Sequence, residues 1–77
     1  MTSEHTYKVV ELVGSSPQGL QPAIENAIAR AGQTLHNLDW FVVKEIRGNI
    51  QEGQVAWYQV TLGVGFRVLD PADLHRE

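Results

Sequence analysis

The sequence predicts an α+β domain in which one helix packs against a three-stranded antiparallel sheet. Two long segments, residues 40–50 and 55–69, are rich in β-branched and aromatic residues and are separated by a short polar turn. A shorter Val-rich segment lies near the start of the chain, at residues 7–13. Between this segment and the long ones, apolar residues recur at helical spacing. The predicted order of elements is therefore β-α-β-β.

The first strand is predicted to end at Gly14, and the helix is predicted to follow it directly. Ser15, Ser16 and Pro17 are typical of a helix start, because Ser caps free backbone amides and Pro suits the first helical position. Pro22 fits a helix only in its first turn, so the start is expected near Gly19. The positions that predict one apolar helix face are Leu20, Ile24, Ala27, Ile28, Ala31, Leu35 and Leu38.

The last strand has the clearest pattern in the chain, because apolar residues occupy every second position. Its predicted inner face, which should pack against the helix, consists of Ala56, Tyr58, Val60, Leu62, Val64, Phe66 and Val68. The opposite face carries Trp57, Gln59, Thr61, Gly63, Gly65 and Arg67. If every strand pair is antiparallel, the third strand must lie in the middle, which gives the spatial order 2-3-1.

The second strand cannot be regular, because its apolar positions change from odd to even numbers. A single β-bulge near Lys44 and Glu45 removes this conflict, since one extra residue reverses the facing of all that follow. The residues then expected to face the helix are Phe41, Val43, Ile46 and Ile50. Those expected to face outward, together with Gln59, are Trp40, Val42, Arg47 and Asn49.

Composition limits the classes of protein that remain. The 77 residues form one domain, 1–77, with an ordered core of about 6–69 and flexible termini. The chain has no cysteine and only scattered histidines, which argues against disulfides and against a metal site. A net charge of −3 gives no reason to expect nucleic acid as a partner. No apolar run is long enough to cross a membrane, so a cytoplasmic protein is expected.

The dimensions of the elements predict a homo-oligomer. A core of this size supplies roughly 3–5 kcal/mol, which usually needs support from elsewhere. The last strand would span about 50 Å, whereas a helix of about 20 residues spans about 30 Å. The sheet face that carries Trp57 and Gln59 has no cover within the chain. Other copies of the chain are therefore expected to bury it.

Several short motifs resemble those of the dodecin family, in the same order and spacing, over about residues 6–69. The motifs are Tyr7-Lys8, Glu11-Leu-Val-Gly-Ser15, Leu38-Asp-Trp-Phe41, Lys44-Glu-Ile-Arg-Gly48, Tyr58-Gln-Val60 and Val64-Gly-Phe-Arg67. The resemblance implies a sheet wrapped around its helix and a hollow homododecamer. It also implies paired flavins held between twofold-related subunits and sandwiched by tryptophans. The implied function is not enzymatic: it is storage and buffering of flavin and protection from flavin photochemistry.

The same resemblance assigns roles to individual residues. Trp40 matches the tryptophan that stacks on the isoalloxazine, and Gln59 the glutamine that bonds its pyrimidine edge. Arg47 matches an arginine beside the flavin, while Lys8 and Arg67 match basic positions that would meet a phosphate or coenzyme A. The chemistry is suitable, because indole offers a broad stacking surface and a primary amide complements a uracil-like edge. Two positions depart from relatives in the family, namely Trp57 and Gly63.

Three readings of function therefore remain open at the level of sequence. The first is a flavin-binding oligomer that takes FMN or riboflavin. The second is a coenzyme A binding or storage oligomer, which would rely on Lys8, Arg47 and Arg67 more than on Trp40. The third is a structural shell without a ligand. An enzyme is not expected, because no nucleophile and base can be assembled from the sequence.

Overall fold

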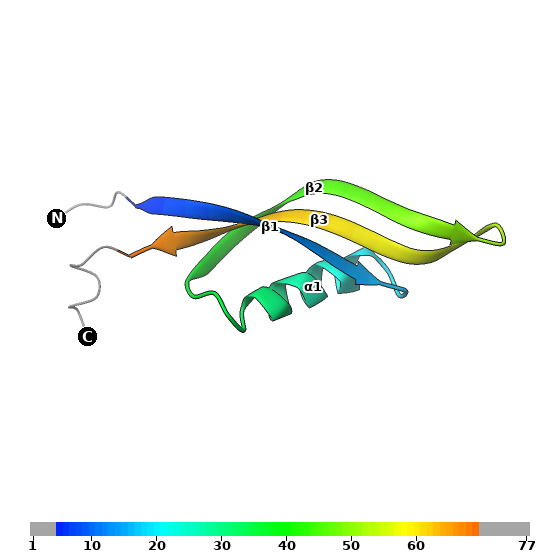
Figure 1. The fold of residues 1–77 in the computed structure, drawn as a ribbon, viewed down its shortest axis with the longest axis horizontal. Coiled ribbons are helices and arrows are strands. Elements are labelled where there is room, and N and C mark those ends of the chain that lie inside the picture. The colour runs from blue at the N-terminus through cyan, green and yellow to red at the C-terminus, as the bar shows by residue number, and fades with distance from the viewer. Residues whose placement is uncertain (1–4, 70–77) are drawn as a thin grey trace.

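The computed structural model describes residues 5–69, which form one sheet and one helix (Figure 1). The elements are β1 (Thr6–Ser16), α1 (Leu20–Ala31), β2 (Leu38–Gln51) and β3 (Gln54–Val68). Strand β3 lies in the middle and runs antiparallel to both neighbours, so the predicted order is confirmed. The flexible termini predicted at either end lie outside the described residues.

Strand β1 is longer than predicted, because Gly14 continues the strand instead of ending it. A Cβ atom at Gly14 would overlap the carbonyl oxygen of Ala23 and lie 2.8 Å from the Cβ of Ala27. Gly14 is thus a place where the helix approaches the sheet closely. Its lack of a side chain serves packing, and the prediction of a strand end at this residue was wrong.

The helix begins where Pro22 requires, with Gly19 as its N-cap and Leu20 as its first residue. The predicted serine caps do not form. The N-cap residue is Gly19, which has no side chain to cap the free backbone amides. Ser16 is buried at the end of β1, and its Oγ accepts a hydrogen bond from the backbone N–H of Gln18 at 3.0 Å. The serine therefore stabilises the turn that leads into the helix.

The helix ends at Ala31, so the prediction that it continues to Leu38 was wrong. The backbone N–H of Gly32 still donates to Ile28 O at 2.9 Å, and that of Leu35 donates to Ala31 O, also at 2.9 Å. A short turn follows, and Leu38 begins β2. Leu38 nevertheless packs against the core. The apolar spacing records only which residues pack against the core. A residue in an irregular segment or at the start of a strand can be buried there as well as a residue in a helix.

The core lies between one face of α1 and the inner face of β3. The buried helix residues are all alanines, Ala23, Ala27 and Ala31, and their small side chains let the helix approach the sheet closely. Val60, Leu62 and Val64 face them with 0%, 0% and 1% of their surface exposed. The predicted apolar face of β3 is therefore confirmed at its centre.

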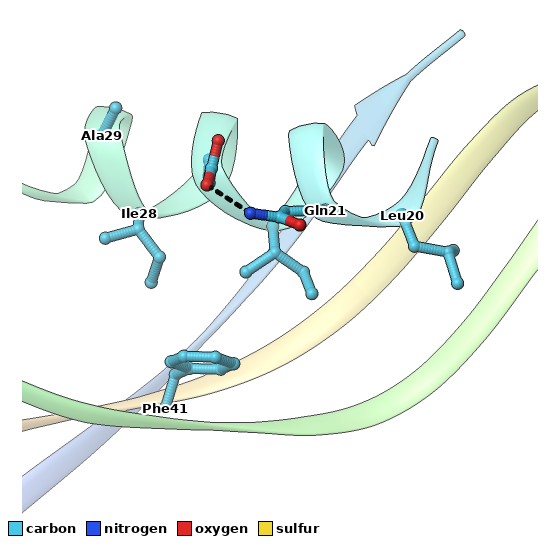
Figure 2. Close-up of a pocket in the computed structure, with 7 residues that line it drawn as sticks. Leu20, Gln21, Ile28, Ala29 and Phe41 are labelled. Atoms are coloured by element: carbon cyan, nitrogen blue, oxygen red, sulfur yellow. Dashed lines mark hydrogen bonds between the residues drawn. The ribbon is translucent and has the colours of Figure 1, made fainter. Parts of the chain in front are cut away.

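The helix packs mainly on β1 and β3 (Figure 1), and a groove lies between α1 and Phe41 of β2. Figure 2 shows Phe41 pointing across this groove from β2 toward the helix, with Leu20 and Ile28 pointing back toward the strands. The groove has a volume of about 760 Å³, and its lining residues are mostly apolar: Leu20, Gln21, Ile24, Glu25, Ile28, Ala29 and Phe41. Phe41 and Ile46 face the helix side as predicted but stay 48% and 58% exposed.

Strand β2 contains the predicted bulge. Val43 pairs with Leu62 and Glu45 pairs with Thr61, so Lys44 is the extra residue. Two further register shifts lie at Leu38/Trp40 and Asn49/Ile50. Ile50 is 73% exposed near the hairpin turn, so the expectation that the helix covers it was wrong.

The bulge also gives Lys44 a partner across the sheet. Its Nζ lies 2.8 Å from Oε2 of Glu11 on β1, so this ion pair joins the two outer strands over β3. The side chain of Lys44 passes over Gly63, where a Cβ atom would lie 3.7 Å from its Cδ. Both partners are about half exposed, so the pair contributes at most about 1 kcal/mol.

Candidate functional site

The outward face of the sheet carries Trp40 directly over a glycine of the middle strand. Trp40 pairs with Gly65 in the antiparallel register. A Cβ atom at Gly65 would overlap three atoms of the indole, Cδ2, Cε2 and Cζ2, so one side of the ring rests on the strand. The Trp40 residue is 43% exposed. The arrangement leaves an aromatic surface open for stacking.

Further aromatic and charged residues surround Trp40. The ring of Tyr7, from β1, lies 6.3 Å from the Trp40 ring at an angle of 51°, and the His5 ring lies 6.5 Å from Tyr7. The hydroxyl of Tyr7 hydrogen-bonds Asp39, which raises the pKa of Tyr7 above its ordinary value. The nearby charge of Arg67 acts in the opposite direction. All three strands therefore contribute to the surroundings of the indole.

We expect Tyr7 to titrate above the ordinary value of 10.0 and Asp39→Asn to bring its pKa down, because the carboxylate accepts a hydrogen bond from the protonated phenol and its charge disfavours the phenolate. Since the folded-state pKa is the higher one, this contribution to stability is present below pH 10 and is lost as pH rises through the folded pKa. Phenolate absorbance in a Tyr58→Phe background, which removes the only other tyrosine, measures the titration. An identical curve with and without the Asp39 carboxylate would contradict the assignment.

A second group of polar residues lies farther along the same face. Arg47 pairs directly with Gln59, so the bulge in β2 brings the two side chains to neighbouring positions. They line a hollow of about 400 Å³, a volume within the range of small-molecule sites. The lining residues are Ser15, Arg47, Gly48, Asn49, Trp57 and Gln59.

One subunit does not bring Trp40 together with this hollow. Trp40 lies over Gly65, and Gln59 lies six residues before Gly65 in β3, which corresponds to about 20 Å. The three residues share a face as the sequence predicts, but they form two separate half-sites. A ligand that contacts both half-sites must either span about 20 Å along one subunit or lie between two copies of the chain.

The two basic positions, Lys8 and Arg67, are not brought together either. Arg67 pairs with Tyr7 and belongs to the outward face that carries Trp40. Lys8 pairs with Phe66, so it points to the opposite, helix side of the sheet. A single phosphate group cannot be bound by both side chains of one subunit.

Sequence reasoning placed Asn49 and Trp57 on the outward face without assigning them to the site, and it missed the other neighbours. Tyr7, Asp39 and Gly65 surround Trp40, and Ser15, Asn49 and Trp57 line the hollow. The alternation of β3 indicates that Trp57 shares the face of Gln59, but the position of Tyr7 follows only from the register between strands. Within residues 5–69, no three His, Cys, Asp or Glu residues gather as metal ligands would. In the same range, no helix is long and apolar enough to span a membrane.

Comparisons with known proteins agree with this architecture. The family model described as Dodecin matches residues 6–69. Dodecin from Thermus thermophilus is 63% identical over 62 residues, covering 80% of this chain and 90% of the relative. The crystal structure of a tryptophan-to-phenylalanine mutant of the Thermus protein is 57% identical with a TM-score of 0.82, covering 87% and 100%. Streptomyces coelicolor dodecin is 54% identical with a TM-score of 0.83, covering 90% and 99%.

The fold and the outward face define a small β-α-β-β protein with an aromatic surface exposed for a planar ligand. The chain belongs to the dodecin family. At this coarse level it is a small flavin-binding protein.

Proposed function

We propose that the protein binds FMN or riboflavin without a covalent bond, stacked on Trp40 at contacts between subunits of a homododecamer. The observation that supports this most strongly is the indole held over Gly65 with an open outer surface. A flat tricyclic ring is suited to such a surface, because stacked aromatic pairs contribute about 0.5–1.5 kcal/mol beyond burial. The residues present therefore fit a flavin.

Gln59 and Arg47 of one copy serve the ring that stacks on Trp40 of another. The separation of about 20 Å between the half-sites supports this division. Gln59 offers one acceptor and two donors to the pyrimidine edge, and Arg47 offers a fixed positive charge. Both side chains are exposed and pair with each other in register, so they are free to serve the same ligand.

The biological role that we propose is storage and protection. Stacking against an electron-rich indole allows a photoexcited flavin to be quenched by electron transfer from Trp40 before it reaches oxygen. Two tryptophans on either side of a pair of rings leave no face for a second substrate. Sequestration, without turnover, is therefore the proposed function.

Absorbance of the purified protein in the flavin bands, together with its mass in solution, tests the proposal. We expect a dodecamer that quenches FMN fluorescence when FMN is titrated into the flavin-free protein. An assembled, colourless protein that leaves FMN fluorescence unchanged would contradict flavin binding and favour a structural shell. Coenzyme A that displaced FMN in competition would revive the second reading, although Lys8 and Arg67 lie on opposite faces.

A further inference from the structure

Two glycines on the outward face of β3, Gly63 and Gly65, differ in what covers them. Gly63 lies beneath aliphatic parts of side chains, with a would-be Cβ 3.2 Å from Val42 Cγ1 and 3.4 Å from Val9 Cγ1. Gly65 lies beneath the indole of Trp40. An aromatic ring laid over a cross-strand glycine is a recognised way of compensating for the missing side chain.

The backbone does not explain Gly65. Among the described residues, the glycines with positive φ are Gly19 and Gly53, so Gly65 adopts a conformation open to any residue. A side chain at this position would instead collide with the ring of Trp40. The absence of a Cβ atom, rather than conformational freedom, is what this position supplies.

Tyr7 of β1 restricts the movement of the Trp40 indole. Its ring lies 6.3 Å from that of Trp40 at 51°, close enough for a tilted aromatic contact. Asp39, the residue next to Trp40 in sequence, is close enough to raise the pKa of the Tyr7 hydroxyl. The phenol therefore lies beside the segment that carries the indole and contacts the indole through its ring.

We propose that Gly65 and Tyr7 are positioning residues that fix the indole of Trp40 flat on the sheet before any ligand arrives. The ligand part of this inference rests on the proposed flavin binding. A side chain that is already immobilised loses less rotational freedom on binding, which corresponds to a gain in affinity of up to about tenfold. The preformed surface would also favour flat, fused-ring ligands, because a mobile indole can adapt to other shapes.

The experiment uses a Trp57→Phe background, in which Trp40 is the sole tryptophan. Gly65→Ala is compared with Gly63→Ala, which adds the same methyl group to the same strand and face beneath movable side chains. Without ligand, Trp40 anisotropy and its quenching by iodide report how firmly the indole is held. Gly65→Ala is expected to lower the anisotropy and increase the quenching, and Gly63→Ala to leave both near the parent values.

FMN titration of the same variants gives the second readout. Gly65→Ala is expected to weaken FMN binding about tenfold, with the solution mass unchanged. Tyr7→Leu tests the proposal from an edge strand if the glycine variant does not fold. Tyr7→Leu is expected to loosen the indole, whereas Tyr7→Phe keeps the ring and most of the restraint.

The outcomes separate the two proposals. A parent protein that does not bind FMN would overturn the proposed function. The anisotropy of the ligand-free variants would still test whether Gly65 and Tyr7 hold the indole in place. Parent protein that binds FMN, with Gly65→Ala and Tyr7→Leu equal to Gly63→Ala in every readout, would overturn the positioning role alone.

Discussion

Trp40→Ala is expected to weaken FMN binding by about 30-fold or more and to restore the fluorescence of FMN in the presence of protein. Removing a central aromatic contact typically costs at least about 2 kcal/mol, and 1.4 kcal/mol corresponds to a tenfold change. In the proposed arrangement a pair of flavin rings lies between two Trp40 side chains. The substitution removes both of them, so both flavins of the pair lose a stacking partner. Fluorescence titration and calorimetry with FMN measure the affinity directly.

The matched control is Trp57→Phe, which removes the other tryptophan of the chain, on the same outward face of the sheet. Trp57 lines the hollow with Arg47 and Gln59 but does not lie over Gly65, so its replacement is expected to weaken FMN binding far less than Trp40→Ala and to leave bound FMN quenched by Trp40. Trp40→Phe should fall between parent and alanine, because it keeps a smaller stacking surface. Unchanged affinity in Trp40→Ala would eliminate the stacking arrangement.

Gly14→Ala is expected to destabilise the subunit by about 3 kcal/mol, the upper end of the usual range for added volume in a packed core. The new methyl group would overlap the carbonyl oxygen of Ala23. Backbone cannot rotate away as a side chain can, so α1 would have to move off β1. A loss of this size is comparable with the whole contribution of a core in so short a chain.

Thermal and urea unfolding of Gly14→Ala measure this effect, and Gly32→Ala provides the control. Gly32 follows the helix with ordinary right-handed backbone angles, and its nearest would-be contact is Ile28 O at 3.5 Å. The same added methyl group is expected to change stability by less than about 1 kcal/mol there. Equal stability of the two variants would show that Gly14 is not the limiting contact between helix and sheet.

The sheet could be predicted from the sequence because its middle strand alternates without interruption. Val60, Leu62 and Val64 are buried where this alternation places them. The bulge at Lys44 could be predicted for a related reason, since no regular strand turns both Phe41 and Ile46 inward. Both conclusions rest on periodicity, which is a local property of the chain.

The end of the helix could not be predicted in this way. Leu38 contacts the core from the start of a strand, and periodicity records only that a residue is buried. The strand end assigned to Gly14 failed for a different reason. A glycine that admits a neighbouring helix and a glycine that begins a turn are identical in sequence, and only tertiary packing distinguishes them.

The sequence predicts which residues of the candidate site share a face, but not the distances between them. The alternation and the bulge place Trp40, Arg47 and Gln59 on one face, as the register confirms. How far apart they lie depends on the pairing of strands, which a single sequence does not specify. The approach of Tyr7 to Trp40 has the same origin, since it requires β1 and β2 to flank β3.

If flavin binds between copies as proposed, the two half-sites about 20 Å apart link ligand binding thermodynamically to quaternary structure. A ligand that contacts both halves binds the assembled protein and not the isolated chain, so mass action stabilises the assembly as the ligand concentration rises. Dissociation of subunits would in turn release the ligand. Occupancy of the site would then rise and fall with the fraction of protein that is assembled. The concentration of ligand would in turn determine the lifetime of the oligomer.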